Sequence, residues 1–359
     1  MNDAEPAVPI PHEVEGLDLA WFRAALAGRF PEARLVASDI VEVMPGTCTK
    51  IRATLTWEGG APQTPASVLI KGGFAEHSHL FLGMHETERR YYRDVAPRAA
   101  FDTPACYFAG RDPQDGRALV VLEDLDRRGV RWLDALTPLD WSEEVRFVDA
   151  LAAFAAQWWE SAELSAEGRL NWVITSYERA AQDYIEAYLA PEVWARFMRL
   201  PRCVCLPRSM HDGDRMRAAL RQLQRRLGGQ PRTLSHGDTH LGNLYLSPGG
   251  APGFLDAQPR AAPWVKDFAY QMVAALDIAD RRRWERPLLA RYLRRLTEAG
   301  VAAPSFEEAW ADYRGELIYG LFIFMINESH FQREETNTAF AARFGAAVQD
   351  HESFALLGC

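Results

Sequence analysis

The amino-acid sequence predicts an α+β protein of two lobes, a small antiparallel-sheet lobe with one key helix followed by a large helical lobe. Three observations predict this fold class. Segments of alternating polarity dominate the chain as far as Leu122, segments of helical periodicity dominate its remainder, and no repeat or low-complexity linker lies between them. We therefore place the small lobe at 1–122, a hinge at 123–129 and the helical lobe at 130–359.

The elements of the small lobe are predicted from local patterns. Residues 18–30 repeat apolar side chains at helical spacing and form a leading helix. Two strands then meet at a turn around Pro45, and the second strand alternates so that Ile51 and Leu55 share one face. The remaining elements are strands at 67–73, 105–110 and 118–125 and a helix at 81–97.

Long amphipathic helices are predicted in the second lobe, because apolar residues recur there at helical spacing. They are expected at 142–160, 176–189, 214–227, 281–300 and 306–327. Two short strand-like pieces, at 234–246 and 252–259, interrupt them. The sequence thus predicts a polar hairpin inside the helical lobe.

Composition limits the classes of partner. The net charge of −9 argues against nucleic-acid binding. The five cysteines are odd in number and scattered, which indicates a reducing compartment without a disulfide framework or a structural zinc site. The longest apolar run, 319–326, is too short to cross a bilayer, and no secretory leader is recognisable. We expect a cytoplasmic protein that binds no membrane, and the sequence leaves its oligomeric state open.

The stretch "LSHGDTHLGNLYL" concentrates polar residues between apolar flanks. In one interpretation His236, Asp238, His240 and Asn243 merely form a turn. In a second, the two histidines and Asp238 bind iron or zinc as a triad, which is typical of β-rich scaffolds. In a third, Asp238 accepts the proton of an attacking hydroxyl and Asn243 holds magnesium, the spacing of kinase catalytic loops. The predicted helical surroundings favour the third interpretation.

Phosphoryl transfer requires further groups, and the sequence offers a candidate for each. Asp256 follows an apolar strand shortly after Asn243 and could bind metal, although such a carboxylate is more often a turn residue or a helix cap. Lys71 ends the strand "SVLIK" as the phosphate-binding lysine of kinases ends its strand. A strand-end lysine is commonly just exposed to solvent.

The helix after Lys71 decides between two carboxylates that could position this lysine. Its predicted apolar face comprises Met84, Glu88, Tyr91 and Val95. Glu86 falls on the other face, together with Arg89. A buried carboxylate is costly unless a cation meets it. We therefore expect Glu88 to point inward and to pair with Lys71.

The motifs "HGDTHLGN", "FLDAQ" and "VKDFAY" resemble those of the small-molecule kinases of the aminoglycoside phosphotransferase and choline kinase clan. The pattern is most similar to the ecdysteroid-kinase-like (CHK-kinase-like) branch, and the resemblance spans residues 36–331. It implies a protein-kinase-like fold that uses ATP or GTP with Mg²⁺. The implied roles are Asp238 as catalytic base, Asn243 and Asp256 as magnesium ligands, Asp267 and His236 as support of the catalytic loop, Lys71 and Glu88 as the phosphate-side ion pair, and backbone groups of Glu123 to Leu125 as the adenine hinge.

Two departures from this pattern stand out. The phosphate loop "PGTCT" has a single glycine, so Gly46, Thr47, Cys48 and Thr49 would bind phosphates through backbone amides or hydroxyls. Ala257 replaces the usual aromatic residue after the metal-binding aspartate, which touches no charge that phosphoryl transfer uses.

The acceptor is expected to be a small hydroxyl compound. The ten residues "AQPRAAPWVK" between the two aspartates leave no room for a peptide-binding activation segment. Glu316 and Glu328 are the few acids around the last predicted helix, which favours an apolar alcohol over an aminoglycoside. Either core packing or acceptor binding would explain the aromatic residues there, Trp310, Tyr313, Tyr319, Phe322, Phe324 and Phe331. A catalytically silent nucleotide-binding protein is a further alternative, although it would not need every charged group named above.

Overall fold

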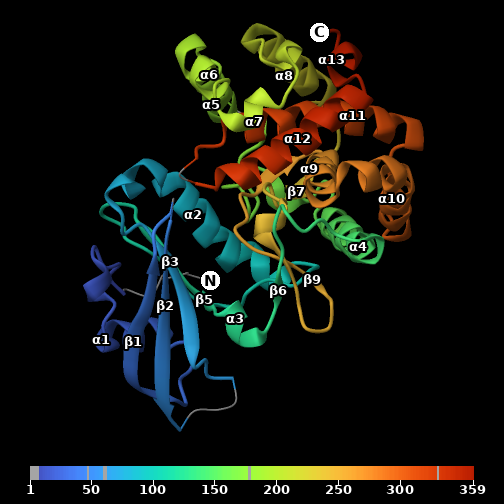
Figure 1. Cartoon of the computed structure of the whole chain (residues 1–359). Helices are drawn as coiled ribbons and strands as arrows, with labels where there is room; N and C mark the ends of the chain where they lie inside the picture. The colour runs from blue at the N-terminus through green and yellow to red at the C-terminus, as the bar shows by residue number, and fades with distance from the viewer. Residues whose placement is uncertain (1–7, 47, 60–62, 177–178, 330) are drawn as a thin grey trace. The chain divides into compact units, whose positions relative to one another are not determined.

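The computed structural model describes residues 8–46, 48–59, 63–176, 179–329 and 331–359 (Figure 1). Its internal contacts divide the chain into two units, Met1–Val130 and Arg131–Cys359. The first unit contains an antiparallel sheet and the second is mainly helical, so the predicted α+β class is confirmed. The predicted hinge segment contains a short helix, α3 (Leu125–Arg128), and its role as a hinge stays a prediction.

The sheet of the first unit has five antiparallel strands in the order β1-β2-β3-β5-β4. The predicted hairpin is present, because β1 and β2 pair on either side of Pro45. The strand bounds are β1 (Arg34–Met44), β2 (Thr49–Glu58), β3 (Ser67–Gly72), β4 (Cys106–Arg111) and β5 (Ala118–Glu123).

The two faces of this sheet carry different helices (Figure 1). On one face, Val68 and Ile70 of β3 join the hydrophobic core that includes Phe22 of α1 (Leu19–Leu26). Successive side chains of a strand point to opposite faces. Lys71 therefore projects from the other face, where α2 (Leu82–Arg90) contacts β4 and β5. Short helical turns complete this unit at η1 (Val14–Gly16), η2 (Glu76–Phe81), η3 (Tyr91–Val95) and η4 (Ala96–Arg98).

The predicted apolar face of α2 is partly wrong. Met84 is exposed, whereas Arg89 is buried. The buried side of the helix is centred on His85 and Glu88 instead, and Arg89 is tolerated there because its charge is met. Its guanidinium donates to the carboxylate of Glu86 at 2.8 and 2.9 Å.

The five long helices predicted for the second unit are present, although residues 177–178 at the start of one lie outside the described residues. They are α4 (Trp141–Gln157), α5 (Arg179–Tyr188), α8 (Gly213–Leu227), α10 (Ile278–Glu298) and α11 (Phe306–Ile326). Two more long helices were not predicted, α9 (Val265–Ala275) and α12 (Glu334–Asp350). Shorter helices are α6 (Pro191–Phe197), α7 (Pro201–Val204), α13 (Ser353–Leu356), η5 (Ala162–Leu164) and η6 (Arg208–Met210).

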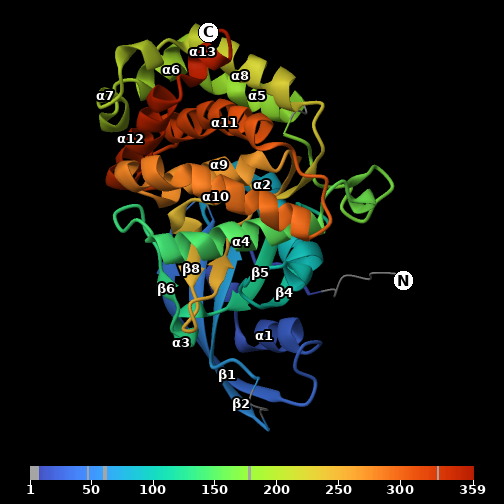
Figure 2. The same ribbon diagram turned by 90° about the vertical axis from the view of Figure 1, so that its right-hand side faces the viewer.

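Helix α9 lies at the centre of the second unit (Figure 2). It packs against α4, α10, α11 and α12, and each of its residues is buried. No helix of the described residues is long and apolar enough to cross a membrane.

The predicted polar hairpin is built from short strands. β8 (Leu244–Leu246) pairs with β9 (Pro252–Phe254), and β6 (Arg131–Trp132) lies on the other side of β8. A separate pair joins β7 (Thr233–Ser235) to β10 (Arg260–Ala262). The loop between β7 and β8 carries the polar stretch.

Two polar side chains join α4 to α9 in the core. Glu144 is fully buried and its Oε2 accepts a hydrogen bond of 2.8 Å from Nε2 of Gln271. Burial raises the pKa of Glu144 from its ordinary 4.5 to about 8. The folded state therefore keeps a proton at pH 7 that the unfolded chain releases. The contribution of Glu144 to the free energy of unfolding is fully present below about pH 4.5 and is lost as the pH rises to about 8.

Replacing Glu144 by glutamine removes this pH dependence while keeping the shape and a hydrogen-bonding amide. We expect Glu144→Gln to raise the free energy of unfolding by about 1–3 kcal/mol at pH 8 and to change it little at pH 5. Thermal unfolding of both proteins between pH 5 and pH 8 measures the effect. The exposed Glu307→Gln serves as a control for the loss of one negative charge, and equal pH profiles for the two variants would contradict the assignment.

Candidate functional site

The loop between β7 and β8 has a backbone that only glycine can adopt at one position. Gly237 has a φ of +86°, and a Cβ there would lie 2.0 Å from the carbonyl oxygen of Gln258. A backbone hydrogen bond also joins the loop to this segment, because the Gln258 N–H donates to the His236 carbonyl at 2.9 Å. The loop therefore has a defined conformation beside the segment that follows β9.

Asp267 of α9 holds this loop through its backbone. Its carboxylate accepts hydrogen bonds from the N–H groups of His236 at 2.5 Å and Gly237 at 2.9 Å. Its backbone carbonyl accepts a third from the hydroxyl of Thr239 at 3.2 Å. Burial raises the pKa of Asp267 to about 6, although both backbone amides favour the charged form. These contacts connect the central helix directly to the polar loop.

Asp238 lies at the exposed side of the same loop. Its Oδ2 accepts a hydrogen bond of 2.8 Å from Nδ2 of Asn243, which also donates to the Asp238 carbonyl at 3.0 Å. The side chain stays one-third exposed. Desolvation raises its pKa, and the neighbouring His240 and Asn243 oppose that shift. A carboxylate that is both desolvated and accessible can accept a proton from a bound hydroxyl group.

Tyr270 is an electrostatic neighbour of Asp238 that sequence reasoning missed. Burial raises the pKa of Tyr270, and the charge of Asp238 raises it further. It lies within the "VKDFAY" motif, three residues after Asp267. Residues three apart share one side of a helix, so helical spacing was a signal that could have found it.

Asp256 lies next to Asn243 at the end of the β8–β9 hairpin. Leu244 pairs with Phe254, and the Leu255 N–H donates to the Asn243 carbonyl at 3.0 Å. Asp256 has a φ of +58°, a left-handed conformation that non-glycine residues adopt at a cost and that is frequent at functional sites. The charge of Asp256 also acts on Asp238. The hairpin thus brings the two predicted metal ligands together.

The donor set of this pair fits magnesium. Nδ2 of Asn243 donates to Asp238, so the side-chain oxygen of Asn243 remains available as an acceptor. Together with the Asp256 carboxylate it offers the oxygen ligands that Mg²⁺ prefers. Both residues could therefore hold this ion.

The alternative two-histidine metal triad is contradicted by the positions of its members. His236 is fully buried, and burial lowers its pKa to about 3, while its ring packs against Phe254 with centroids 5.7 Å apart. Nδ1 of His240 accepts a hydrogen bond of 3.0 Å from the Gly242 N–H. Among the described residues, no three His, Cys, Asp or Glu side chains are close enough to bind one metal ion.

The predicted ion pair between Lys71 and Glu88 is present in the first unit. Nζ of Lys71 contacts Oε1 of Glu88, and both side chains are buried. Strand β3 supplies the lysine and helix α2 the carboxylate. A buried cation and anion that meet in this way hold the lysine in one orientation.

The predicted phosphate-loop residues lie at the turn between β1 and β2. The Gly46 carbonyl is 3.0 Å from Nε2 of His77. Sγ of Cys48 lies 3.4 Å from the Gly72 carbonyl, and Thr49 is buried as the first residue of β2. Thr47 lies outside the described residues. The role of this turn in phosphate binding stays a prediction.

The predicted adenine-binding segment follows β5. Glu123 ends that strand and its N–H donates to the Ala105 carbonyl at 2.8 Å. Asp124 caps the N-terminus of α3 and accepts a hydrogen bond of 2.5 Å from the hydroxyl of Ser67. Leu125 begins the helix and is buried. Adenine binding by this segment stays a prediction.

Most aromatic residues of α11 proposed for the acceptor pocket are core residues. Tyr313, Phe322 and Phe324 are buried, which favours the packing interpretation for these three. Tyr319 is half-buried, and Nζ of Lys266 lies 3.1 Å from the centroid of its ring. Tyr319 therefore remains as a candidate for contact with a ligand.

Tyr184 of α5 is a second residue that the sequence did not suggest. Burial raises its pKa, and the charges of its neighbours, among them Tyr319 and Asp238, raise it further. Its side chain is nonetheless 48% exposed. Helices α5 and α9 thus each bring one tyrosine, Tyr184 and Tyr270, into the electrostatic neighbourhood of Asp238, and Tyr319 of α11 acts on both tyrosines.

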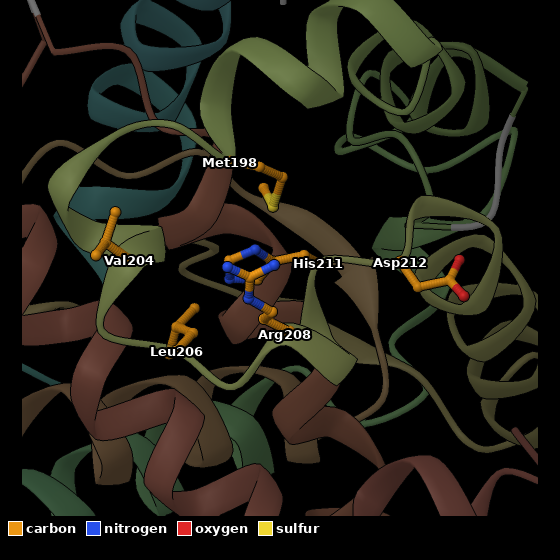
Figure 3. A pocket seen from close by; sticks show the side chains of 6 residues that line it. All are labelled: Met198, Val204, Leu206, Arg208, His211 and Asp212. Atoms are coloured by element: carbon orange, nitrogen blue, oxygen red, sulfur yellow. The ribbon is translucent and has the colours of Figure 1, made fainter.

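A separate pocket of about 580 Å³ lies elsewhere in the second unit (Figure 3). Its lining residues are Met198, Val204, Leu206, Arg208, His211 and Asp212. None of the residues that the sequence singled out lines it, so it is distinct from the polar loop.

Comparisons with known proteins bear on the fold. No protein-family model matches the chain, and no curated protein sequence matches it. A protein from Ralstonia eutropha JMP134, described as a candidate aminoglycoside phosphotransferase, aligns with a TM-score of 0.53 and 16% identity over 92% of this chain and 96% of its own. Choline kinase LicA from Streptococcus pneumoniae aligns with a TM-score of 0.52 and 14% identity over 92% of this chain and 98% of its own. Choline kinase from Cryptosporidium parvum Iowa II aligns with a TM-score of 0.51 and 8% identity over 90% of this chain and 89% of its own.

These similarities establish that the chain has the two-lobed, protein-kinase-like fold of aminoglycoside phosphotransferases and choline kinases. LicA has also been solved in complex with AMP. The predicted resemblance to this clan is therefore confirmed for the fold. Similarity to the ecdysteroid-kinase-like branch stays a prediction.

Removing the charge of Asp267 tests its hold on the loop. An asparagine in its place presents an amide group to one of the two backbone N–H donors, so we expect Asp267→Asn to lower the free energy of unfolding by about 1–3 kcal/mol. Denaturant unfolding measures the loss. The matched control is Asp212→Asn, since Asp212 also accepts two backbone N–H bonds but caps an exposed helix, where asparagine is equally suitable. Equal effects of the two substitutions would contradict the assignment.

Proposed function

We propose that the protein is a phosphotransferase that moves the γ-phosphoryl group of ATP or GTP to a hydroxyl group of a small molecule. The observation that carries this proposal is the loop with Asp238 and Asn243, whose backbone Asp267 fixes, together with Asp256, which the β8–β9 hairpin brings next to Asn243. The kinase-like fold and the Lys71–Glu88 ion pair support it.

The proposed reaction forms a bond between the acceptor oxygen and the γ-phosphorus, and breaks the bond from that phosphorus to the oxygen bridging it to the β-phosphate. The proton of the acceptor hydroxyl passes to the carboxylate of Asp238. Asn243 and Asp256 would hold Mg²⁺, which supplies positive charge against the phosphates when bound. Lys71, oriented by Glu88, contacts phosphate oxygens. The backbone between Gly46 and Thr49 and the segment from Glu123 to Leu125 are the proposed nucleotide contacts.

We further propose that the acceptor is a hydroxyl compound without multiple positive charges, with an apolar part. Glu316 in the middle of α11 and Glu328 just after this helix already have cationic partners. Glu316 lies 3.7 Å from Lys266, and Glu328 lies 2.6 Å from Arg196. The ammonium group of Lys266 also lies against the face of Tyr319, which an acceptor cation would otherwise use. These pairings support an apolar alcohol over an aminoglycoside.

Nucleotide binding is the first test. Mg-ATP or Mg-GTP at about a hundred times its Kd should stabilise the folded protein by about 2.7 kcal/mol. Differential scanning fluorimetry with and without magnesium measures this as an increase in Tm. Asp256→Asn should remove the part of the shift that needs magnesium, whereas Asp280→Asn, a carboxylate on α10, should leave it unchanged. The absence of any shift with either nucleotide would overturn the proposal.

Acceptor turnover is the second test. ADP formation should be measured over a panel of aminoglycosides, choline-like amines, sugars and apolar alcohols, and we expect the uncharged alcohols to give the highest kcat/KM. Asp238→Asn should lower kcat by about 10²- to 10⁴-fold and keep the Tm shift with Mg-ATP. Turnover confined to polycations would overturn the acceptor class alone. Nucleotide binding without turnover of any acceptor would indicate a catalytically silent protein, and a larger loss in His240→Ala would contradict the role of Asp238.

A further inference from the structure

Asp124 is a buried carboxylate in the middle of the segment proposed to contact the nucleotide. The residue is only 4% exposed, although it belongs to the connection between β5 and α3. A buried carboxylate is costly unless donors from the protein meet it. The chain leaves β5 at Glu123 and enters α3 at Leu125, so Asp124 alone joins the two elements. The orientation of Asp124 therefore sets the course of this segment.

Three donors meet the carboxylate of Asp124, and two of them come from neighbouring strands. The hydroxyl group of Ser67, the first residue of β3, donates to Oδ2 at 2.5 Å. Nη1 of Arg52, on β2, donates to the same oxygen at 3.4 Å. Oδ1 accepts a hydrogen bond of 3.3 Å from the Asp126 N–H. Ser67 is as buried as Asp124, so water does not compete for the shortest of these charge-assisted contacts.

Arg52 is itself held by two further carboxylates. Its Nη2 donates to Oδ2 of Asp126 at 2.5 Å, and its Nε lies 3.2 Å from Oε2 of Glu42 on β1. The guanidinium group is planar and its donors point in fixed directions, so contacts with three carboxylates leave it a single orientation. Asp124 is thereby attached to the sheet through both β2 and β3.

The other end of the segment is anchored in the same unit. The Glu123 carboxylate accepts a hydrogen bond of 3.2 Å from the Ala105 N–H, and Nη1 of Arg128 lies 3.4 Å from the same oxygen. Nη2 of Arg128 also donates to Asp102 at 2.7 Å. All of these groups belong to the first unit, so the segment is ordered on both sides without a nucleotide.

We propose that Ser67 and Arg52 are positioning residues for the nucleobase, because through the Asp124 carboxylate they hold the backbone from Glu123 to Leu125 where the base binds. This inference rests on the proposed phosphotransferase function, which assigns nucleotide contacts to that segment. A purine carries donors and acceptors at fixed places on its edge, and backbone groups match them over a narrow range of distance and angle. A segment that is ordered beforehand also loses less entropy on binding. The contacts with Asp124 therefore contribute to affinity for the base and not for the phosphates.

Ser67→Ala tests the proposal because it removes one hydroxyl group and keeps the strand. Its Kd should be measured for Mg-ATP or Mg-GTP, whichever the wild type binds more tightly, and for Mg-tripolyphosphate, which has no base. We expect affinity for the nucleotide to fall by about 3- to 30-fold and affinity for tripolyphosphate to stay unchanged. With turnover, KM for the nucleotide should rise by the same factor at constant kcat.

Ser38→Ala is the matched control, since Ser38 lies on β1, which β2 and β3 separate from β5. Unchanged nucleotide affinity in Ser67→Ala, an equal loss for tripolyphosphate, or an equal loss in Ser38→Ala would overturn the proposal. So would a lower kcat at constant KM.

A double-mutant cycle shows whether the effect passes through Asp124. Asp124→Ser keeps a side chain that can cap α3 but removes the carboxylate. In this background Ser67→Ala should weaken nucleotide binding little further, because its acceptor is already gone. Arg52→Met keeps most of the apolar stem, and we expect it to weaken nucleotide binding but not tripolyphosphate binding. The same fold-loss for Ser67→Ala in both backgrounds would contradict the positioning role.

The hold on the segment can also be measured without a nucleotide. Hydrogen–deuterium exchange of the Asp126 and Arg127 N–H groups, which donate to the side chain and the carbonyl of Asp124, should become faster in Ser67→Ala. Exchange in α1 should stay the same. Unchanged exchange of both groups would overturn the inference even if the protein binds nucleotide. If exchange responds as expected but the wild type binds neither nucleotide, the proposed function has failed, and the role in base binding falls with it.

Discussion

The conformation of the polar loop between β7 and β8 depends on one carboxylate, that of Asp267. Two successive N–H groups of the loop, from His236 and Gly237, point at it, and Gly237 adopts a conformation closed to other residues. In any other loop conformation these two backbone N–H groups would lose their charge-assisted hydrogen bonds to the buried carboxylate. The positions of Asp238 and Asn243 therefore follow from an interaction in which neither takes part.

Burying α9 on all sides is what makes Asp267 available at this point, and each polar residue of the helix needs a partner. Gln271 bonds to the neutral carboxyl group of Glu144, and Lys266 lies between Glu316 and the ring of Tyr319. The C-terminal carbonyl groups are also met, since the buried guanidinium of Arg343 donates to the carbonyl of Ala274. Desolvation lowers the pKa of Arg343 to about 10. The helix tolerates these buried polar groups because side chains of neighbouring elements pair with them.

Local patterns predicted the strands of the first unit and five long helices of the second. The strand alternation of β2 and the long amphipathic helices were read correctly, and so was the pairing of Lys71 with Glu88. The sequence did not indicate that even the polar residues of α9 are buried, because that depends on partners from other elements. The burial of Arg89 was missed because it depends on the position of Glu86. Motif spacing predicted that Asp238 and Asn243 act together, and the structure places their side chains in hydrogen-bond contact.

The same limit explains why the aromatic residues of α11 were ambiguous. A helix that is apolar all round carries no sign of which side meets a ligand, and the structure assigns Tyr313, Phe322 and Phe324 to the core. Tyr319 differs because a cation already lies on its ring and an acid lies beside that cation. The ring's negative face is thereby neutralised within the protein, so what it can still offer a ligand is its edge, its hydroxyl group and its apolar area. These features are compatible with the uncharged alcohol that we propose as acceptor.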